Sequence, residues 1–215
     1  AQRIAEKGFA HMLDFINVGR TEKEIQLELD YYMLKNGAEA LSFDTIALSG
    51  SNTSLPHGVP SDKKVESGEF VLMDFGATYD GWHSDMTRTV CVGKPSDKMK
   101  SVYETVLNAQ LSALDAVKAG MSGKELDKIA RDIITEAGYG DNFGHSLGHG
   151  VGVEIHESPY ASPSREDILP ENSIVTVEPG IYLEGKFGVR IEDFVVVTEN
   201  GCINMTKAPK ELICL

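Results

Sequence analysis

The chain has 215 residues, ordinary apolar and charged fractions, and a net charge of −13, a composition typical of a soluble globular protein with a substantial core. The acidic balance argues against nucleic acid or an anionic membrane as the partner, because both attract basic surfaces. The three cysteines, Cys91, Cys202 and Cys214, form no Cys-x-x-Cys pair, which argues against a disulfide framework and predicts a reducing, cytoplasmic location.

Two helices are predicted at the start of the chain. Residues 1–17 carry apolar side chains at helical spacing, and Gly19 ends this helix. Thr21 and Glu24 have the spacing of a capping box, which opens a second helix that stops before Gly37.

Strands are predicted after the second helix, because short apolar runs there are separated by turn residues. The pair Asp80-Gly81 is a typical two-residue hairpin turn. The predicted strands of this part cover residues 43–48, 70–75 and 83–92.

The helical pattern returns after Pro95 and ends at Gly120. Ser122 and Glu125 form a second capping box, and the helix that it opens ends at Gly138. The predicted strands that follow cover residues 151–155, 174–177 and 189–197.

The second half of the sequence repeats the first. The capping boxes and their flanking glycines recur at one offset, from Gly19 to Gly120, and the run 71–76 matches 175–180 slightly later. We therefore expect one domain over 1–215 with internal repeats at about 1–98 and 99–215. Its fold class is α+β, a pseudo-twofold duplication of helix, helix and antiparallel strands, with the helices on one face of a curved sheet.

Four acidic residues fall at related places in the two halves. The duplication aligns Asp74 with Glu178, each on an apolar strand, and the next strand of each half carries Asp85 or Glu192. Each acid alone is compatible with a surface or salt-bridged residue. Four carboxylates around one axis repel one another, so the group needs protons or cations.

A glycine-rich stretch, residues 144–157, contains three histidines, among them His149. Glycine at this density disfavours a helical zinc site, and the stretch is interpreted as a tight loop that leads into the strand at 151–155. A turn with surface histidines is the alternative. One imidazole among carboxylates suits manganese, cobalt or iron(II) better than structural zinc. Two cations held by carboxylates are a hydrolytic device.

These motifs resemble the pita-bread-fold metallopeptidases, which include methionine aminopeptidase, aminopeptidase P and prolidase. The resemblance implies five ligands for two divalent metal ions, with Asp85 and Glu192 bridging; manganese is expected, cobalt is the next choice, and iron(II) or zinc fits less well. The ligands so implied are Asp74, Asp85, His149, Glu178 and Glu192. The segments that carry the resemblance are Asp74-Phe75-Gly76, Ser84-Asp85-Met86-Thr87-Arg88-Thr89, Gly148-His149-Gly150-Val151-Gly152, Glu178-Pro179-Gly180-Ile181-Tyr182 and Arg190-Ile191-Glu192-Asp193.

Within that family, His145-x-x-x-His149 followed by Ile155-His156-Glu157 is similar to the signature of the proline peptidases. The resemblance implies an exopeptidase, an Xaa-Pro aminopeptidase or dipeptidase, whose substrate is a peptide with proline at the second position. Methionine aminopeptidase is one alternative, against which His145 argues. A non-catalytic pita-bread module that binds peptides or proteins is another, against which the five filled ligand positions argue. The resemblance also implies an amino-terminal domain absent from this chain, and it leaves a homodimer open.

The resemblance gives roles to further residues. Glu178 is expected to act as the general base in addition to binding metal, with pure ligation as the alternative. His156 and His57 are expected to contact the substrate and assist catalysis, and His145 to line the site near the proline; structural or loop histidines are the alternatives. Arg190 is expected to orient Glu192, with a solvent salt bridge as the alternative. Thr87 is expected to share a face with Asp85.

Overall fold

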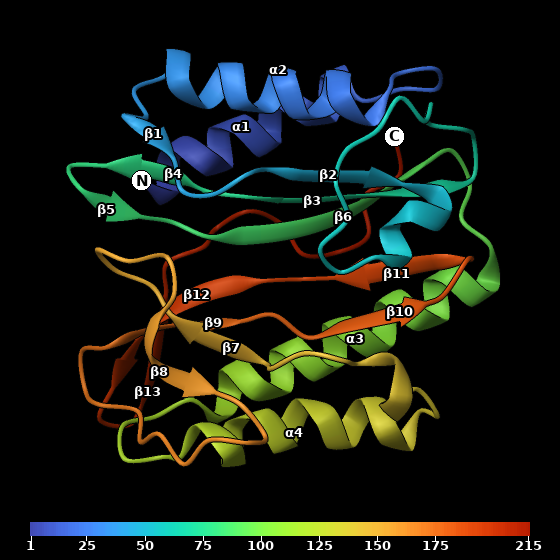
Figure 1. The fold of residues 1–215 in the computed structure, drawn as a ribbon. Coiled ribbons are helices and arrows are strands. Elements are labelled where there is room, and N and C mark those ends of the chain that lie inside the picture. The colour runs from blue at the N-terminus through green and yellow to red at the C-terminus, as the bar shows by residue number, and fades with distance from the viewer.

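The computed structural model describes residues 1–215, and the chain forms two similar halves (Figure 1). In Figure 1 one pair of helices lies at the top of the molecule and the other at the bottom, with the strands between them. The first half contains α1 (Gln2–Phe15), α2 (Glu22–Lys35), β1 (Ala40–Leu41), β2 (Ile46–Ser49), the 3₁₀ helix η1 (Gly50–Ser54), β3 (Glu69–Phe75), β4 (Ala77–Tyr79), β5 (Trp82–His83) and β6 (Met86–Val92). The second contains α3 (Asp97–Ala116), α4 (Gly123–Glu136), η2 (Gly140–Asn142), β7 (Gly148–Gly150), β8 (Glu157–Ala161), β9 (Ile174–Val177), β10 (Gly180–Leu183), β11 (Phe187–Arg190), β12 (Asp193–Thr198) and β13 (Gly201–Asn204).

The strands of each half pair mainly with one another, and every ladder is antiparallel. The main sheet of the first half has the order β2-β3-β6, and that of the second half has the order β13-β12-β9-β7-β8. Two smaller sheets, β1-β4-β5 and β10-β11, complete the strand layer. This arrangement brings β3 and β6 of one half towards β11 and β12 of the other, as Figure 1 shows.

The predicted duplication is confirmed by local geometry. Both capping boxes form, with Thr21 and Ser122 as the N-caps of α2 and α4. The glycines that precede the two helices have the same left-handed conformation, with φ of 94° at Gly19 and 81° at Gly120, which a residue with a side chain rarely adopts. The two halves therefore begin with the same turn and the same helix start.

Each half has its own apolar core between its helices and its strands. Phe9 on α1 and Leu29 on α2 pack with Met73 of β3 in the first half. Val102 on α3 and Leu126 on α4 are buried in the core of the second half with its strand residues. Because the helices cover the outside of the strand layer, the polar ends and breaks of the strands remain available for a site between the halves.

Three predicted strands differ from the structure. The strand expected at 151–155 is wrong: the strand is Gly148–Gly150, it is irregular in register, and residues 151–156 form a loop. The runs 83–92 and 189–197 each divide into two strands, and the breaks fall at Asp85 and Glu192. The turn at Asp80-Gly81 is confirmed and joins β4 to β5, with both residues at positive φ. Each break therefore places an acidic residue between two strands.

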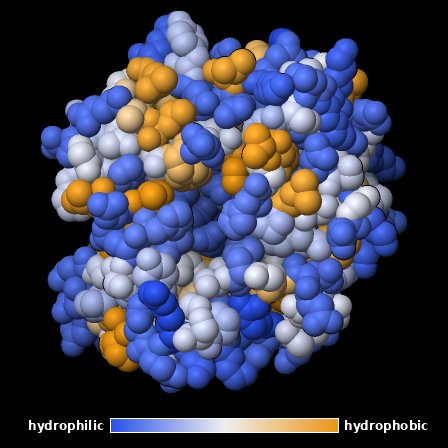
Figure 2. Space-filling model, in the orientation of Figure 1, coloured by the Kyte–Doolittle hydropathy of each residue, from blue (hydrophilic) through white to orange (hydrophobic).

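The surface agrees with the composition. In Figure 2 the visible face is mainly hydrophilic with separate hydrophobic patches, and a hydrophilic hollow lies between the two halves. None of the helices combines the length and the apolar character needed to cross a bilayer. All three cysteines are free thiols.

Candidate metal centre and active site

A cavity of about 340 Å³ receives nearly all of the predicted site residues. Its lining draws on both halves, since β3 and the start of β6 belong to the first half and β7, β9 and β11 to the second. Thr87 is buried and is the one predicted residue that does not line the cavity. The predicted residues in the lining are His57, Asp74, Asp85, His145, His149, His156, Glu178, Arg190 and Glu192.

The two aspartates reach the cavity because the chain crosses itself closely between them. Asp74 lies near the end of β3, and Asp85 directly precedes β6. A Cβ atom at Gly76 would lie 1.8 Å from the carbonyl oxygen of Ser84, so only glycine allows this approach. The two glutamates occupy the corresponding places of the second half, Glu178 directly after β9 and Glu192 in the break between β11 and β12.

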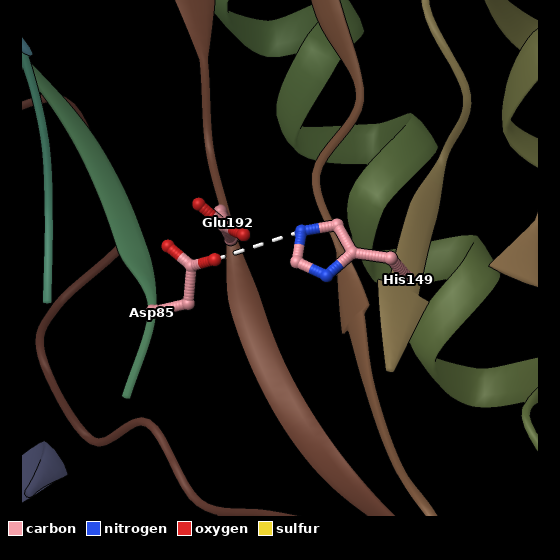
Figure 3. Close-up of side chains that lie close together, drawn as sticks. All are labelled: Asp85, His149 and Glu192. Carbon is pink, nitrogen blue, oxygen red and sulfur yellow. Dashed lines mark ion pairs between the residues drawn. The ribbon is translucent and has the colours of Figure 1, made fainter. Parts of the chain in front are cut away.

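His149 points its Nε2 atom at the carboxylates (Figure 3). Its Nδ1 lies 3.0 Å from the carbonyl oxygen of Gly150, so Nδ1 carries the proton and Nε2 keeps a free lone pair. Nε2 lies 3.6 Å from Oδ2 of Asp85 and 3.4 Å from Oε1 of Glu178. This is the tautomer that a metal-binding imidazole requires.

Burial and mutual repulsion both disfavour the ionised form of these carboxyl groups. Burial, followed by the charges of Asp74 and Glu178, raises the pKa of Asp85. Burial and the neighbouring acids also raise the pKa of Glu192. Burial raises the pKa of Glu178 to about 8, although the Arg190 charge acts in the opposite direction. The site therefore favours either protons or added positive charge.

Divalent cations fit these residues. Asp85, His149 and Glu192 each offer a ligand atom, and these atoms lie within 4.8 Å of one another. Figure 3 shows the three side chains pointing toward one another. Oδ1 of Asp74 and Oε1 of Glu192 are buried without any hydrogen-bond donor, which is costly for an anionic oxygen. A cation would satisfy both oxygens and offset the repulsion that raises the carboxyl pKa values.

Arg190 and Thr87 support the carboxylates in a way that differs from the prediction. The guanidinium of Arg190 contacts Oδ2 of Asp74 and makes no direct contact with Glu192, the residue it was expected to orient. Its Nε donates to the Thr87 hydroxyl at 3.0 Å, and that hydroxyl donates to Oε2 of Glu192 at 2.8 Å. By hydrogen bonds, Arg190 therefore reaches Glu192 through Thr87.

Tyr182 links the predicted arginine and one of the predicted histidines. Its hydroxyl lies 2.8 Å from Nη1 of Arg190 and 2.8 Å from Nε2 of His145. Burial, then the Arg190 charge, lowers the pKa of His145 to about 3, so this imidazole is neutral and accepts from the tyrosine. The sequence carried only a weak signal for this role, because Tyr182 lies in the same motif as Glu178, four residues further along. That spacing does not identify a contact, because the segment is not helical. Phe43, Ile46, Ser146 and Tyr160 also line the cavity and carried no such signal.

His156 and His57 lie on loops at the cavity. The ring of His156 meets that of His149 edge to face, with centroids 4.3 Å apart. Burial and the nearby His149 lower the pKa of His156, so it is a neutral N–H donor near pH 7. His57 is exposed and lies in the segment between η1 and β3. Both rings can therefore reach a bound substrate from outside the carboxylate cluster.

Comparison with known proteins agrees with this geometry. A model of metallopeptidase family M24 matches residues 1–199. A Xaa-Pro dipeptidase of Pyrococcus furiosus is 51% identical over 99% of this chain and 61% of its own length. A solved Xaa-Pro dipeptidase from Bacillus anthracis and a solved X-Pro aminopeptidase from Thermotoga maritima each match with a TM-score of 0.98 and 52% identity, over 100% of this chain and 61% of theirs. The chain thus spans about three fifths of the length of the relatives that it matches.

Proposed function

Because the chain belongs to metallopeptidase family M24 and has the pita-bread fold, we propose that it is the catalytic domain of a metal-dependent exopeptidase. The reaction is hydrolysis of the bond between an amino-terminal residue and proline. The observation that carries the proposal is that four carboxylates and one imidazole from two halves of the chain face one cavity. The names of the similar proteins support proline peptides over amino-terminal methionine as the substrate.

The residues that would hold two divalent cations are Asp74, Asp85, His149, Glu178 and Glu192. When bound, the cations would lower the pKa of a water molecule and polarise the substrate carbonyl. The oxygen-rich donor set favours manganese, with cobalt as the next choice.

Glu178 acts as the general base in this proposal. Thr176 donates to its Oε1 at 3.1 Å and holds the carboxylate towards the cavity. Glu178 accepts a proton from the attacking water, whose oxygen forms the new bond to the carbonyl carbon. It then delivers the proton to the proline nitrogen as the C–N bond breaks. The leaving nitrogen needs this proton in any peptide bond. Because the nitrogen of an Xaa-Pro bond bears no hydrogen before cleavage, the site needs no acceptor for an amide N–H.

The histidines complete the site. The neutral His156 donates its N–H to the developing oxyanion of the tetrahedral intermediate, and His57 contacts the substrate from the opposite loop. His145, held by Tyr182, lines the part of the cavity that receives the proline. Arg190 and Thr87 act behind the ligands, since they bind Asp74 and Glu192 respectively.

The test is hydrolysis of an Xaa-Pro dipeptide and an Xaa-Pro-Xaa tripeptide, after chelation and again with manganese or cobalt restored. We expect metal-dependent cleavage, and the ratio of the two rates separates a dipeptidase from an aminopeptidase. Glu178→Ala and His149→Ala should abolish turnover with an unchanged far-UV circular dichroism spectrum. Turnover that survives either substitution would refute the assignment, and metal binding without any cleavage would favour a non-catalytic module.

A further inference from the structure

One buried carboxylate lies outside the cavity and has no part in the proposed metal centre. Glu22 is the first residue of α2 and is 0% exposed. It takes part in none of the ion pairs of the structure, and the nearby Lys63 pairs with Glu69 instead. A carboxylate in such a place is costly unless hydrogen bonds replace its water.

The hydrogen bonds of Glu22 come from the two ends of one loop. Its Oε1 accepts from the backbone N–H of Ser49 at 2.7 Å and from the side-chain amide of Asn52 at 3.0 Å. Its Oε2 accepts from the backbone N–H and the hydroxyl of Ser61, at 3.0 and 2.6 Å. Charge-assisted bonds of this kind are stronger than neutral ones, so Glu22 closes the base of the segment 50–60.

That segment carries His57 to the cavity. Three hydrogen bonds join it to the second half: the Gly188 N–H donates to the Thr53 hydroxyl at 2.7 Å, the Gly185 N–H to the Ser54 hydroxyl at 3.3 Å, and Arg190 to the carbonyl of Pro56 at 3.3 Å. Only the last of these bonds reaches the stretch after Ser54 that contains His57. The flanking side chains of Leu55 and Val59 are 52% and 82% exposed and contribute little packing. The position of His57 therefore depends on the base of the segment together with the Arg190 contact at Pro56.

The second half shows that a helix of this fold does not need a carboxylate at this position in order to start. Residue 123, which corresponds to residue 22 at the offset that relates Gly19 to Gly120, is a glycine. The helix that begins there has the same capping box, and the N–H of Gly123 is bound by a carbonyl just as that of Glu22 is. A helix of this fold therefore starts without a carboxylate at this place, and Glu22 serves what the first half alone possesses, the His57 segment.

We propose that Glu22 is a positioning residue that fixes the 50–60 segment so that His57 faces the bound substrate. The inference rests on the substrate-contacting role proposed for His57. Glu22 itself touches neither the cavity nor the proposed metal ligands. Each carboxylate oxygen accepts from a backbone N–H, that of Ser49 or that of Ser61, so a neutral amide in its place would set its NH₂ group against one of these N–H groups.

The experiment is Glu22→Gln in the metal-loaded protein, with Glu24→Gln as the matched control. Glu24 lies in the same first turn, holds the capping box, pairs with Arg20 at 3.8 Å and makes no contact with the 50–60 segment. We expect kcat/KM for an Xaa-Pro peptide to fall by about 10- to 100-fold in Glu22→Gln, the range produced by small misplacement of an active-site group. Manganese affinity measured by calorimetry should be unchanged. In a His57→Ala background, Glu22→Gln should cause no further loss, because both changes remove the same contact.

Equal activity of the two glutamine variants, or an undiminished effect of Glu22→Gln in the His57→Ala background, would overturn the inference. If Glu22→Gln does not fold, Ser61→Ala removes one donor and should lower kcat/KM in the same His57-dependent way. Amide hydrogen exchange gives a readout that needs no turnover. Faster exchange over residues 50–60 in Ser61→Ala than in Glu24→Gln supports the positioning role even if the wild type does not cleave proline peptides, and equal exchange contradicts it.

Discussion

Replacing Arg88 should lower the free energy of unfolding more than replacing any exposed charged residue, because Arg88 joins the two halves. Arg88 is 1% exposed, and its guanidinium donates five hydrogen bonds. Among the acceptors are the carbonyl oxygen of Glu192 and Oδ1 of Asp193, which belong to the second half, and the carbonyl oxygen of Pro209 near the end of the chain. One side chain of β6 therefore joins three parts of the molecule.

The magnitude follows from the burial of both partners. The side chains of Arg88 and Asp193 are 1% and 0% exposed, and removal of one member of a fully buried ion pair costs about 3–5 kcal/mol. In a domain of this size each kcal/mol corresponds to about 2–4 °C in Tm, so we expect Arg88→Met to lower Tm by about 6–20 °C. Lys210 and Asn204 still contact Asp193 in the variant, which favours the lower part of this range.

The assay is urea and thermal unfolding of the metal-free protein, followed by far-UV circular dichroism. Arg165→Met is the matched control, because Arg165 is half exposed and its nitrogen lies 3.9 Å from Asp167; it should cost less than about 1 kcal/mol. Arg88→Lys should recover little of the loss, since an ammonium group cannot supply five donors in the same plane. Equal midpoints for Arg88→Met and Arg165→Met would refute the reasoning.

Two further predictions concern the metal centre. Thr87→Val removes the hydroxyl between Arg190 and Glu192 and should weaken manganese binding by about 10- to 100-fold in calorimetry; Thr105→Val, at a half-buried position on α3 that does not line the cavity, is the control, and equal affinities would contradict the role. Burial raises the folded-state pKa of Glu178 to about 8 from an ordinary value of 4.5, so its contribution to stability is complete below pH 4.5 and is lost as the pH rises to about 8. Between about pH 7.5, where histidines of the unfolded chain with an ordinary pKa of about 6.5 are largely neutral, and about pH 8.5, urea unfolding of the metal-free protein should show declining stability, and Glu178→Gln should flatten the decline; identical slopes would count against it.

Much of the fold was predictable because its signals are local. The capping boxes and the terminal glycines mark the helices, and both features depend on neighbouring residues only. The duplication then predicted that Asp74 and Glu178 occupy equivalent positions in the two halves, without any knowledge of contacts. The proximity of His149 to these acids was expected from the resemblance, and the structure places all three in one cavity.

The parts that sequence patterns missed depend on long-range geometry. The strand expected at 151–155 is a loop, because Gly150 packs against the backbone of Glu157 and Ser158 and the chain leaves the sheet after it. The breaks at Asp85 and Glu192 are invisible in runs of β-branched and apolar residues. The partner of Arg190 also depended on a contact across 116 positions in the chain, with Asp74, which strand alternation cannot reveal.

The proposed ligands come from opposite halves of the molecule, Asp74 and Asp85 from one and His149, Glu178 and Glu192 from the other. Whatever free energy a cation gains on binding is therefore also gained by the contact between the halves, and by linkage it raises the cost of unfolding. Free metal at 100 times its Kd would add about 2.7 kcal/mol. Metal supply would then set the lifetime of the protein against proteolysis as well as its catalytic rate, so metal-starved cells would contain fewer molecules and not only slower ones.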